Sequence, residues 1–135
     1  VFVIYKLPGF SRNLRKEIAK SKRWYFVDNG ILNTLLGDFR PLSQRNDVGA
    51  LWENYLVSER VKRQSETGFI GKNYFWRTYD QQEIDWVEES AGKLDAFEIK
   101  WSKQKVKTPT AWRKAYPDAT FSVIHQNNYQ SFLGT

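Results

Sequence analysis

The sequence predicts an α/β fold in which a mixed central sheet is flanked by helices. Three observations support this class: one long amphipathic helix pattern, three closely spaced strand patterns, and a second helix followed by one more strand. Apolar residues recur at a spacing of three to four in the helix pattern and alternate with polar residues in the strand patterns. The expected order of the main body is therefore α-β-β-β-α-β.

Each element of the main body has its own signal. Asp47 is expected to be the N-cap of the long helix, which covers about residues 48–62. The strand patterns are rich in aromatic and β-branched residues and are separated by Asp80-Gln81 and Ala91-Gly92. Pro117 is expected to end the second helix. The predicted ranges are strands at 72–79, 83–88 and 94–101, a helix at 108–115 and a strand at 120–125.

Residues 1–40 are predicted to form a lead-in to the domain at residues 41–135. The lead-in is expected to contain a strand at 1–5, a basic helix or irregular arm at 11–20, and a strand at 22–27. Asp28 is expected to cap a short helix that stops at Gly37. The apolar residues of that helix are Ile31, Leu32, Leu35 and Leu36.

The composition narrows the class of protein. The 135 residues include no cysteine, so a disulfide framework or a thiolate metal site is excluded, which suits a reducing compartment such as the cytoplasm. No apolar run approaches the length that spans a membrane, so no membrane partner is expected. Methionine is absent even at position 1, and we therefore expect the chain to be part of a longer protein.

The net charge of +6 is concentrated in residues 12–23 and 100–107, and aromatic residues lie beside both stretches. Such patches favour a polyanionic partner, most simply nucleic acid, and we expect DNA. A basic surface without a partner is the alternative. The candidate nucleic-acid-binding residues are Arg77, Lys103, Lys105 and Lys107, although Arg77 is also compatible with an ordinary surface arginine.

The stretch DAFEIKWS, residues 95–102, places Glu98 and Lys100 on one face of a strand and apolar residues on the other. We predict that residues 90–93 form a four-residue hairpin loop, which fixes the register with the preceding strand. The expected cross-strand pairs are Glu89–Leu94, Trp86–Phe97, Ile84–Ile99, Asp85–Glu98 and Glu83–Lys100.

Two opposed carboxylates destabilise a strand pair unless a cation lies between them. Mg²⁺ accepts one or two carboxylates and keeps waters for a phosphate substrate, so Asp85 and Glu98 are candidate metal ligands. Lys100 would steady an attacking hydroxide or the charge on the phosphate. Glu53 falls in an apolar column of the long helix, where a carboxylate needs a partner or a metal, and is a candidate third acid.

The alternative interpretation of these residues is structural. The acids and Lys100 would then form the solvated face of a hairpin, with a weak Glu83–Lys100 ion pair, and Glu53 would lie at the edge of the helix. His125, the only histidine, is interpreted as structural. No glycine-rich phosphate-binding motif of the GxxxxGK[ST] or GxGxxG kind is present.

Four segments in order carry a resemblance to known families: YFVDNGILNTLLG, GALWENYLVSE, YFWRTYDQQEIDWV and FEIKWS. Together they resemble a domain of unknown function at the C-terminal end of prokaryotic AAA-type ATPases. The acids with the Glu-Ile-Lys triplet also resemble the PD-(D/E)XK nuclease superfamily, whose core is restriction-endonuclease-like. The lead-in is similar to the end of the winged-helix segment that precedes this domain.

The resemblance implies a site and a context. Asp85, Glu98 and the accessory acid Glu53 would hold Mg²⁺ or Mn²⁺, and Lys100 would assist the nucleophile. The ATPase module would lie outside this chain, so the chain is not expected to hydrolyse ATP. The leading expectation is Mg²⁺-dependent cleavage of DNA; the alternatives are a catalytically inactive DNA-binding module and a regulatory or partner-docking domain of the ATPase.

Overall fold

The computed structural model of the chain describes residues 4–30, 33 and 37–134. Its strands form two sheets, a two-stranded sheet of order β1-β2 and a four-stranded sheet of order β3-β4-β5-β6. The elements are β1 (Ile4–Pro8), β2 (Lys22–Phe26), the short 3-10 helix η1 (Leu42–Gln44), α2 (Val48–Thr67), β3 (Lys72–Arg77), β4 (Glu83–Ser90), β5 (Lys93–Ile99), α3 (Thr110–Ala115), β6 (Thr120–Ile124) and α4 (Tyr129–Leu133).

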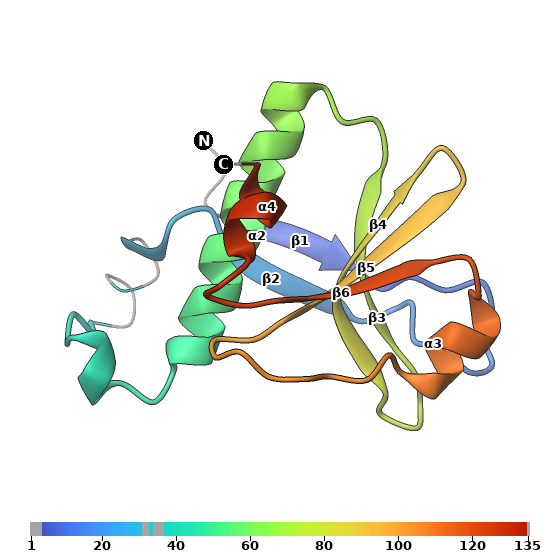
Figure 1. Cartoon of the computed structure of the whole chain (residues 1–135), viewed down its shortest axis with the longest axis horizontal. Coiled ribbons are helices and arrows are strands. Elements are labelled where there is room, and N and C mark those ends of the chain that lie inside the picture. The colour runs from blue at the N-terminus through green and yellow to red at the C-terminus, as the bar shows by residue number, and fades with distance from the viewer. Residues whose placement is uncertain (1–3, 31–32, 34–36, 135) are drawn as a thin grey trace.

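The four-stranded sheet is mixed, as the sequence predicts. β3, β4 and β5 are antiparallel neighbours, and β6 joins β5 in the parallel direction. A parallel neighbour requires a crossover, and the segment that contains α3 supplies it. In Figure 1, α2 and α4 lie together on one side of the molecule and α3 lies at the opposite end. The predicted α-β-β-β-α-β order is confirmed from α2 to β6.

Two clusters of buried side chains cover the two faces of this sheet. The first cluster joins the sheet to β1, β2, α2 and α4, and the second joins it to α3. The first contains Leu7, Tyr25, Leu56, Val57, Phe75, Trp86, Ile99, Ile124 and Phe132. The second contains Phe10, Trp76, Ile84, Val87, Leu94, Ala96, Trp112 and Tyr116.

The long helix α2 extends one turn further than predicted. It ends at Gly68, whose φ of 71° is the left-handed conformation that glycine accepts at a helix C-terminus. Asp47 does lie at the N-cap position, but its side chain makes no capping hydrogen bond. The Asp47 carboxylate instead accepts two hydrogen bonds from Arg45, at 2.8 and 2.7 Å. The ion pair with Arg45 therefore takes the place of the expected capping hydrogen bond.

The β4–β5 hairpin has a tighter turn than predicted. Its loop has two residues, Ala91 and Gly92, because Ser90 still pairs with Lys93. Both loop residues have positive φ, 52° and 76°, as a two-residue hairpin turn requires. A two-residue loop and the predicted four-residue loop give the same register. The predicted pairs Glu89–Leu94 and Trp86–Phe97 are confirmed.

A β-bulge interrupts the pairing of β4 with β3. The register shifts between Tyr74 and Trp76, where the two β4 residues Asp85 and Trp86 lie opposite Phe75 alone. A bulge puts an extra residue on one strand and so breaks the alternation of its side chains. Asp85 consequently points to the same side of the sheet as Trp86, which is the side that α2 covers.

Because of the bulge, the predicted contact between Ile84 and Ile99 is wrong. The strict alternation placed Ile84 and Trp86 on one face, with Ile84 against Ile99. In the structure Ile84 belongs to the second cluster, whereas Trp86 and Ile99 belong to the first. The reason is the extra residue at the bulge, which the sequence pattern does not reveal.

The lead-in is part of the same core. β1 and β2 form an antiparallel pair, and residues 11–20 form the irregular arm rather than a helix. Leu7 and Tyr25 are buried against the four-stranded sheet. The predicted strand at 1–5 is displaced, since β1 covers Ile4–Pro8 and residues 1–3 lie outside the described residues. Most of the helix predicted after Asp28, including all four of its apolar residues, also lies outside the described residues.

Candidate active site

The predicted acids gather where the N-terminal half of α2 meets the ends of β4 and β5. Asp85 is central in this group. Its Oδ2 accepts a hydrogen bond from the backbone N–H of Ile99 at 2.9 Å, and its Oδ1 lies 3.2 Å from Nη1 of Arg23. The same nitrogen of Arg23 lies 4.0 Å from Oε1 of Glu53. Glu53 from the helix and Asp85 from the bulge therefore face one cation.

Arg23 of β2 is a site residue that the sequence reasoning missed. Besides Asp85 and Glu53, its guanidinium contacts Glu83 at 3.3 Å and lies 4.7 Å from the centre of the Phe75 ring. The side chain is only 24% exposed. In the sequence Arg23 is one of several basic residues in a charged stretch, and nothing local marks it as the one that turns inward.

Glu98 and Lys100 meet at the end of β5, where Nζ of Lys100 lies 3.5 Å from Oε1 of Glu98. Glu98 is largely buried, with 12% of its side chain exposed, and Lys100 is more open. The Glu83–Lys100 pair of the structural alternative does not form. Glu83 is held instead by Arg23 and by Arg77, the latter at 3.5 Å, because both arginines lie closer to the start of β4.

Burial raises the pKa of Glu53 and of Glu98, and the neighbouring Asp85 carboxylate raises both further. Each pKa lies at about 8, against an ordinary value of 4.5. The positive charge of Arg23 opposes the shift at Glu53, and that of Lys100 opposes it at Glu98. Since both glutamates respond to Asp85, the three carboxyl groups form one electrostatic unit.

The hydroxyl of Tyr25 is buried next to this unit. It lies within interaction range of Glu53 and Arg23 but makes no hydrogen bond of normal geometry to the described part of the chain. Burial and the Glu53 carboxylate raise the pKa of Tyr25 well above its usual range. A buried polar atom without a partner is uncommon in folded proteins and here marks the inner wall of the acidic site.

The acids do not form a ready-made metal site. Among the described residues, no group of three or more His, Cys, Asp or Glu side chains is arranged to hold a metal ion. Arg23 takes the position between Glu53 and Asp85 and supplies the positive charge that two nearby carboxylates require. The oxygen donors are those that Mg²⁺ and Mn²⁺ prefer, but a metal must compete with this guanidinium.

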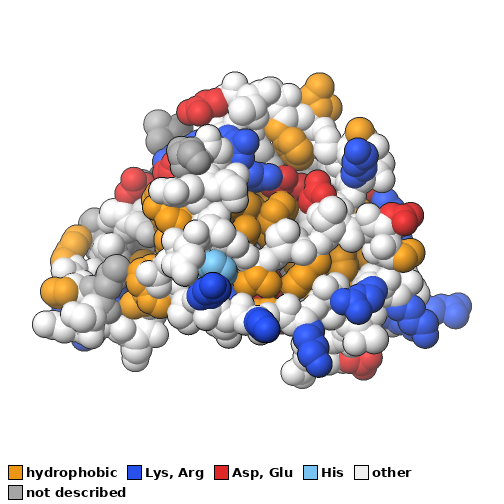
Figure 2. Space-filling view, in the orientation of Figure 1, with side chains coloured by type: hydrophobic (Ala, Val, Ile, Leu, Met, Phe, Trp, Pro, Cys, Tyr) orange, Lys and Arg blue, Asp and Glu red, His pale blue; other side chains and the backbone are white. Residues whose placement is uncertain are grey.

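The predicted nucleic-acid-binding residues fall into two groups. Lys103, Lys105 and Lys107 are exposed on the segment between β5 and α3 and form no ion pair within the described residues. Figure 2 shows several Lys and Arg side chains along the face where Figure 1 draws this segment. Arg77, by contrast, is engaged with Glu83. The Nδ1 of His125 accepts the backbone N–H of Asn127, a local contact of the kind that a structural histidine makes.

The segment that carries the acids also matches a known family. Residues 48–133 match the model of a family described as a domain of unknown function, DUF4143. The chain therefore belongs to the DUF4143 family. The DUF4143 match includes Glu53, Asp85, Glu98 and Lys100. Arg23 lies outside it, within residues 1–42, which match a second family of unknown function, DUF8612. The acidic site thus combines side chains from two separately described segments.

Two curated relatives of this DUF4143 chain are named as uncharacterised proteins. It is 32% identical over 102 residues to the uncharacterised protein Rv2008c of Mycobacterium tuberculosis and to the uncharacterised protein Mb2031c of Mycobacterium bovis. The match covers 73% of the chain but 22% of each relative, so the chain spans about a fifth of their length. No solved structure matches it significantly. Among the helices that the structure describes, none has the length and apolar character needed to cross a membrane.

Proposed function

We propose that this DUF4143 domain is a metal-dependent phosphodiesterase that cleaves DNA, with a restriction-endonuclease-like core of the PD-(D/E)XK kind. One observation carries the proposal: Asp85 at a β-bulge lies next to Glu53 and Glu98, with Lys100 at the end of the same strand as Glu98. The α-β-β-β-α-β order of the chain agrees with such a core. Bulges are frequent next to active sites because they redirect a side chain.

Asp85 and Glu98 would hold the metal, and Glu53 would be an accessory acid. Mg²⁺ requires only one or two protein carboxylates, and Mn²⁺ accepts the same oxygen donors. Burial, and after it the Asp85 carboxylate, raises the pKa of Glu53 and of Glu98 to about 8, and a bound divalent cation would favour the ionised form of both. When bound, the metal would supply an activated water and a Lewis acid for the phosphate.

The protein groups would orient and stabilise the reactants. Lys100 is a compact charge held 3.5 Å from Glu98, where it can steady an attacking hydroxide or the charge that develops on the phosphate. The backbone N–H of Ile99 fixes the Asp85 carboxylate. Lys103, Lys105 and Lys107, which have no ion-pair partner in the described residues, would hold the DNA backbone.

The proposed context is a larger ATPase. The match to about a fifth of each curated relative leaves room for other domains in those proteins. The sequence motifs resemble the domain at the C-terminal end of prokaryotic AAA-type ATPases. In that arrangement an ATP-driven module would act on the DNA and this domain would cut it.

The test is nicking of supercoiled DNA in Mg²⁺ or Mn²⁺, with EDTA as the blank. Asp85→Ala and Lys100→Ala should each reduce the rate at least about a hundredfold, the usual effect of removing a charge that stabilises the transition state. Glu59→Ala is the matched control, since Glu59 is a partly exposed acid of α2 and forms an ion pair only with Lys62 among the described residues. Activity that survives both site variants would refute the assignment.

A second function is favoured by Arg23. Its guanidinium already contacts Glu53, Glu83 and Asp85, as expected of a domain that keeps the fold but binds DNA without cutting it. This candidate predicts DNA binding that weakens with salt, together with no cleavage in any divalent metal. The nicking assay and a salt titration of DNA binding separate the two functions.

A further inference from the structure

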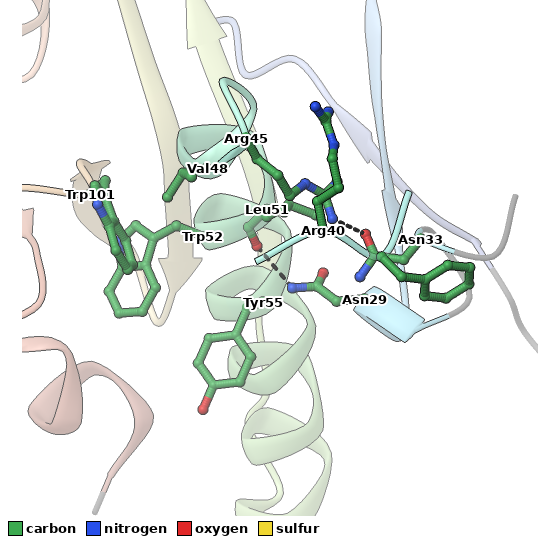
Figure 3. A pocket seen from close by; sticks show the side chains of 10 residues that line it. Asn29, Asn33, Arg40, Arg45, Val48, Leu51, Trp52, Tyr55 and Trp101 are labelled. Atoms are coloured by element: carbon green, nitrogen blue, oxygen red, sulfur yellow. Dashed lines mark hydrogen bonds between the residues drawn. The ribbon is translucent and has the colours of Figure 1, made fainter. Parts of the chain in front are cut away.

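An aromatic cavity lies along the N-terminal half of α2, the helix that also carries Glu53. It has a volume of about 430 Å³, within the range of about 300 to 1,000 Å³ that small-molecule sites occupy. Its aromatic walls are Phe39, Trp52, Tyr55 and Trp101. Figure 3 shows Trp52 and Tyr55 on α2 and Trp101 from the segment that follows β5.

The aromatic rings are arranged as a corner. The rings of Trp52 and Tyr55 are stacked at 6.0 Å and 23°, whereas Trp101 meets Trp52 edge-on at 5.3 Å and 77°. Trp101 and Tyr55 remain 36% and 38% exposed, so part of each ring is still open to a ligand. These exposed ring surfaces can stack on a further flat ring.

Two residues that line the cavity are neighbours in sequence of proposed site residues. Trp52 directly precedes Glu53 on α2, and Trp101 directly follows Lys100 after β5. The two tryptophans touch, so the cavity and the proposed cleavage site share the same corner of the fold. Consecutive residues of a helix point about 100° apart, so the cavity opens on a different side of α2 from Glu53, and a strand that enters it would continue past the acids.

Charge is distributed so that the cavity suits an uncharged ring and the segment that follows Trp101 suits phosphate. The two arginines in its wall are already paired, Arg45 with Asp47 at 2.7 Å and Arg40 with Asp38 at 2.8 Å. The lysines of the segment after Trp101 have no such partner within the described residues. These are Lys103, Lys105 and Lys107, and they line a shallow hollow with His125.

We propose that this cavity binds an unpaired nucleobase, so that the domain acts next to a single-stranded segment of its substrate. The inference rests on the proposed function and names the substrate class of that site. A base in a duplex is already stacked and paired and cannot enter, whereas an unpaired base stacks on aromatic side chains while lysines hold its backbone. The proposed occupant is a base of single-stranded DNA.

The test is binding of the full chain to labelled oligothymidylate of about ten nucleotides, measured by fluorescence anisotropy. EDTA is present, so that cleavage cannot contribute. A duplex of equal length and an oligouridylate are the comparison ligands. Trp101→Ala should weaken single-strand binding about five- to hundredfold and duplex binding less than about twofold. Tyr55→Ala is a second variant at the same cavity and should have the same selectivity.

Trp24→Ala is the matched control. Trp24 is 61% exposed on β2 and does not line the cavity, so its removal should leave binding unchanged. A joint replacement of the three lysines by alanine should reduce the dependence of binding on salt for both DNA forms. Tighter binding of oligothymidylate than of oligouridylate supports the DNA strand, and the reverse order assigns the cavity to RNA and overturns the assignment to DNA.

Two outcomes would overturn the inference entirely. One is equal loss of single-strand and duplex binding, or no loss, in both Trp101→Ala and Tyr55→Ala. The other is concentration-dependent self-association of the chain that Trp101→Ala abolishes, which would assign the cavity to a second copy. Because binding is measured in EDTA, a failed nicking assay leaves this result standing. If the chain nicks DNA and Trp101→Ala changes neither binding nor nicking, the nuclease assignment stands and the role of the cavity is refuted.

Discussion

Arg23 is a cation that three acids of the site share. Its guanidinium lies 3.2 Å from Asp85, 3.3 Å from Glu83 and 4.0 Å from Glu53. Any divalent cation that approaches Asp85 must displace one of these contacts. The residue therefore sets how readily the carboxylates accept a metal.

Arg23→Ala should increase the affinity for Mn²⁺ about tenfold or more, because carboxylates freed from a guanidinium bind another cation more strongly. Isothermal titration calorimetry at low salt measures this affinity. Arg77→Ala is the control, since among the acids Arg77 contacts only Glu83 in the described residues. Unchanged Mn²⁺ affinity in Arg23→Ala would show that Arg23 does not compete with the metal.

Glu53 makes the stability of the protein depend on pH. Its pKa of about 8, above the ordinary 4.5, means that between these values the folded state holds a proton that the unfolded state has released. Stability in EDTA should therefore fall as pH rises through this window. Glu53→Gln should raise the free energy of unfolding by about 1 to 2 kcal/mol near pH 8 and change it little near pH 4.

Urea unfolding at a series of pH values in EDTA measures this effect. The carboxamide that Glu53→Gln introduces keeps the shape of the side chain but does not ionise, so only the charge is removed. A variant with the same pH dependence as the wild type would show that Glu53 ionises normally in the folded state.

At the level of elements, α2 is fastened to β4 by a buried ion pair. Arg60 contacts Glu88 through two hydrogen bonds of 2.7 and 2.8 Å, and Glu88 also accepts the ring N–H of Trp86 at 2.8 Å. The side chains of Arg60 and Glu88 are 16% and 6% exposed. The Arg60–Glu88 ion pair thus fixes the position of α2, which carries Glu53, relative to β4, which carries Asp85.

Glu88→Ala should destabilise the fold by about 3 kcal/mol or more, because it leaves the buried Arg60 charge without its carboxylate counter-ion. Replacing both residues by apolar ones of similar size should recover much of the loss. Denaturant unfolding measures both. Glu59→Ala is the more exposed counterpart, since the side chains of Glu59 and Lys62 are 37% and 48% exposed and their pair should contribute about 0 to 1 kcal/mol. Similar losses at the two sites would contradict the argument.

Across the whole molecule, the lead-in and the DUF4143 segment fold as one body. Leu7 and Tyr25 belong to the first core cluster. On the other face of the sheet, the buried Glu17 accepts hydrogen bonds from the hydroxyl of Tyr116 and the ring N–H of Trp76. Removing the lead-in would uncover both faces of the sheet as well as the acids.

A fragment of residues 41–135 should therefore lose cooperative unfolding, because it exposes apolar core and leaves Trp76 without its acceptor. Thermal unfolding followed by near-ultraviolet circular dichroism compares it with the full chain. Leu14→Ala in the full chain is the control, since Leu14 is 70% exposed and should contribute little. A fragment that melts as the full chain does would show that the lead-in is dispensable.

Local sequence patterns were enough to predict the elements and much of their pairing. The 3.6-residue and two-residue periods locate α2, the strands and the β4–β5 register because each depends on neighbours that are close along the chain. The same local patterns singled out Glu53, Asp85, Glu98 and Lys100, and the structure gathers them at one corner. Turn length was less well determined, since a two-residue loop and a four-residue loop give the same register.

The cation that the acids face is fixed by tertiary packing alone. Arg23 and Asp85 are separated by 62 positions in the chain, and their contact depends on the bulge that turns Asp85 toward α2. Neither the bulge nor the inward turn of one arginine among many leaves a periodic signal. Local periodicity reports which face of an element is buried, whereas the partner of a buried charge is fixed by how distant elements pack.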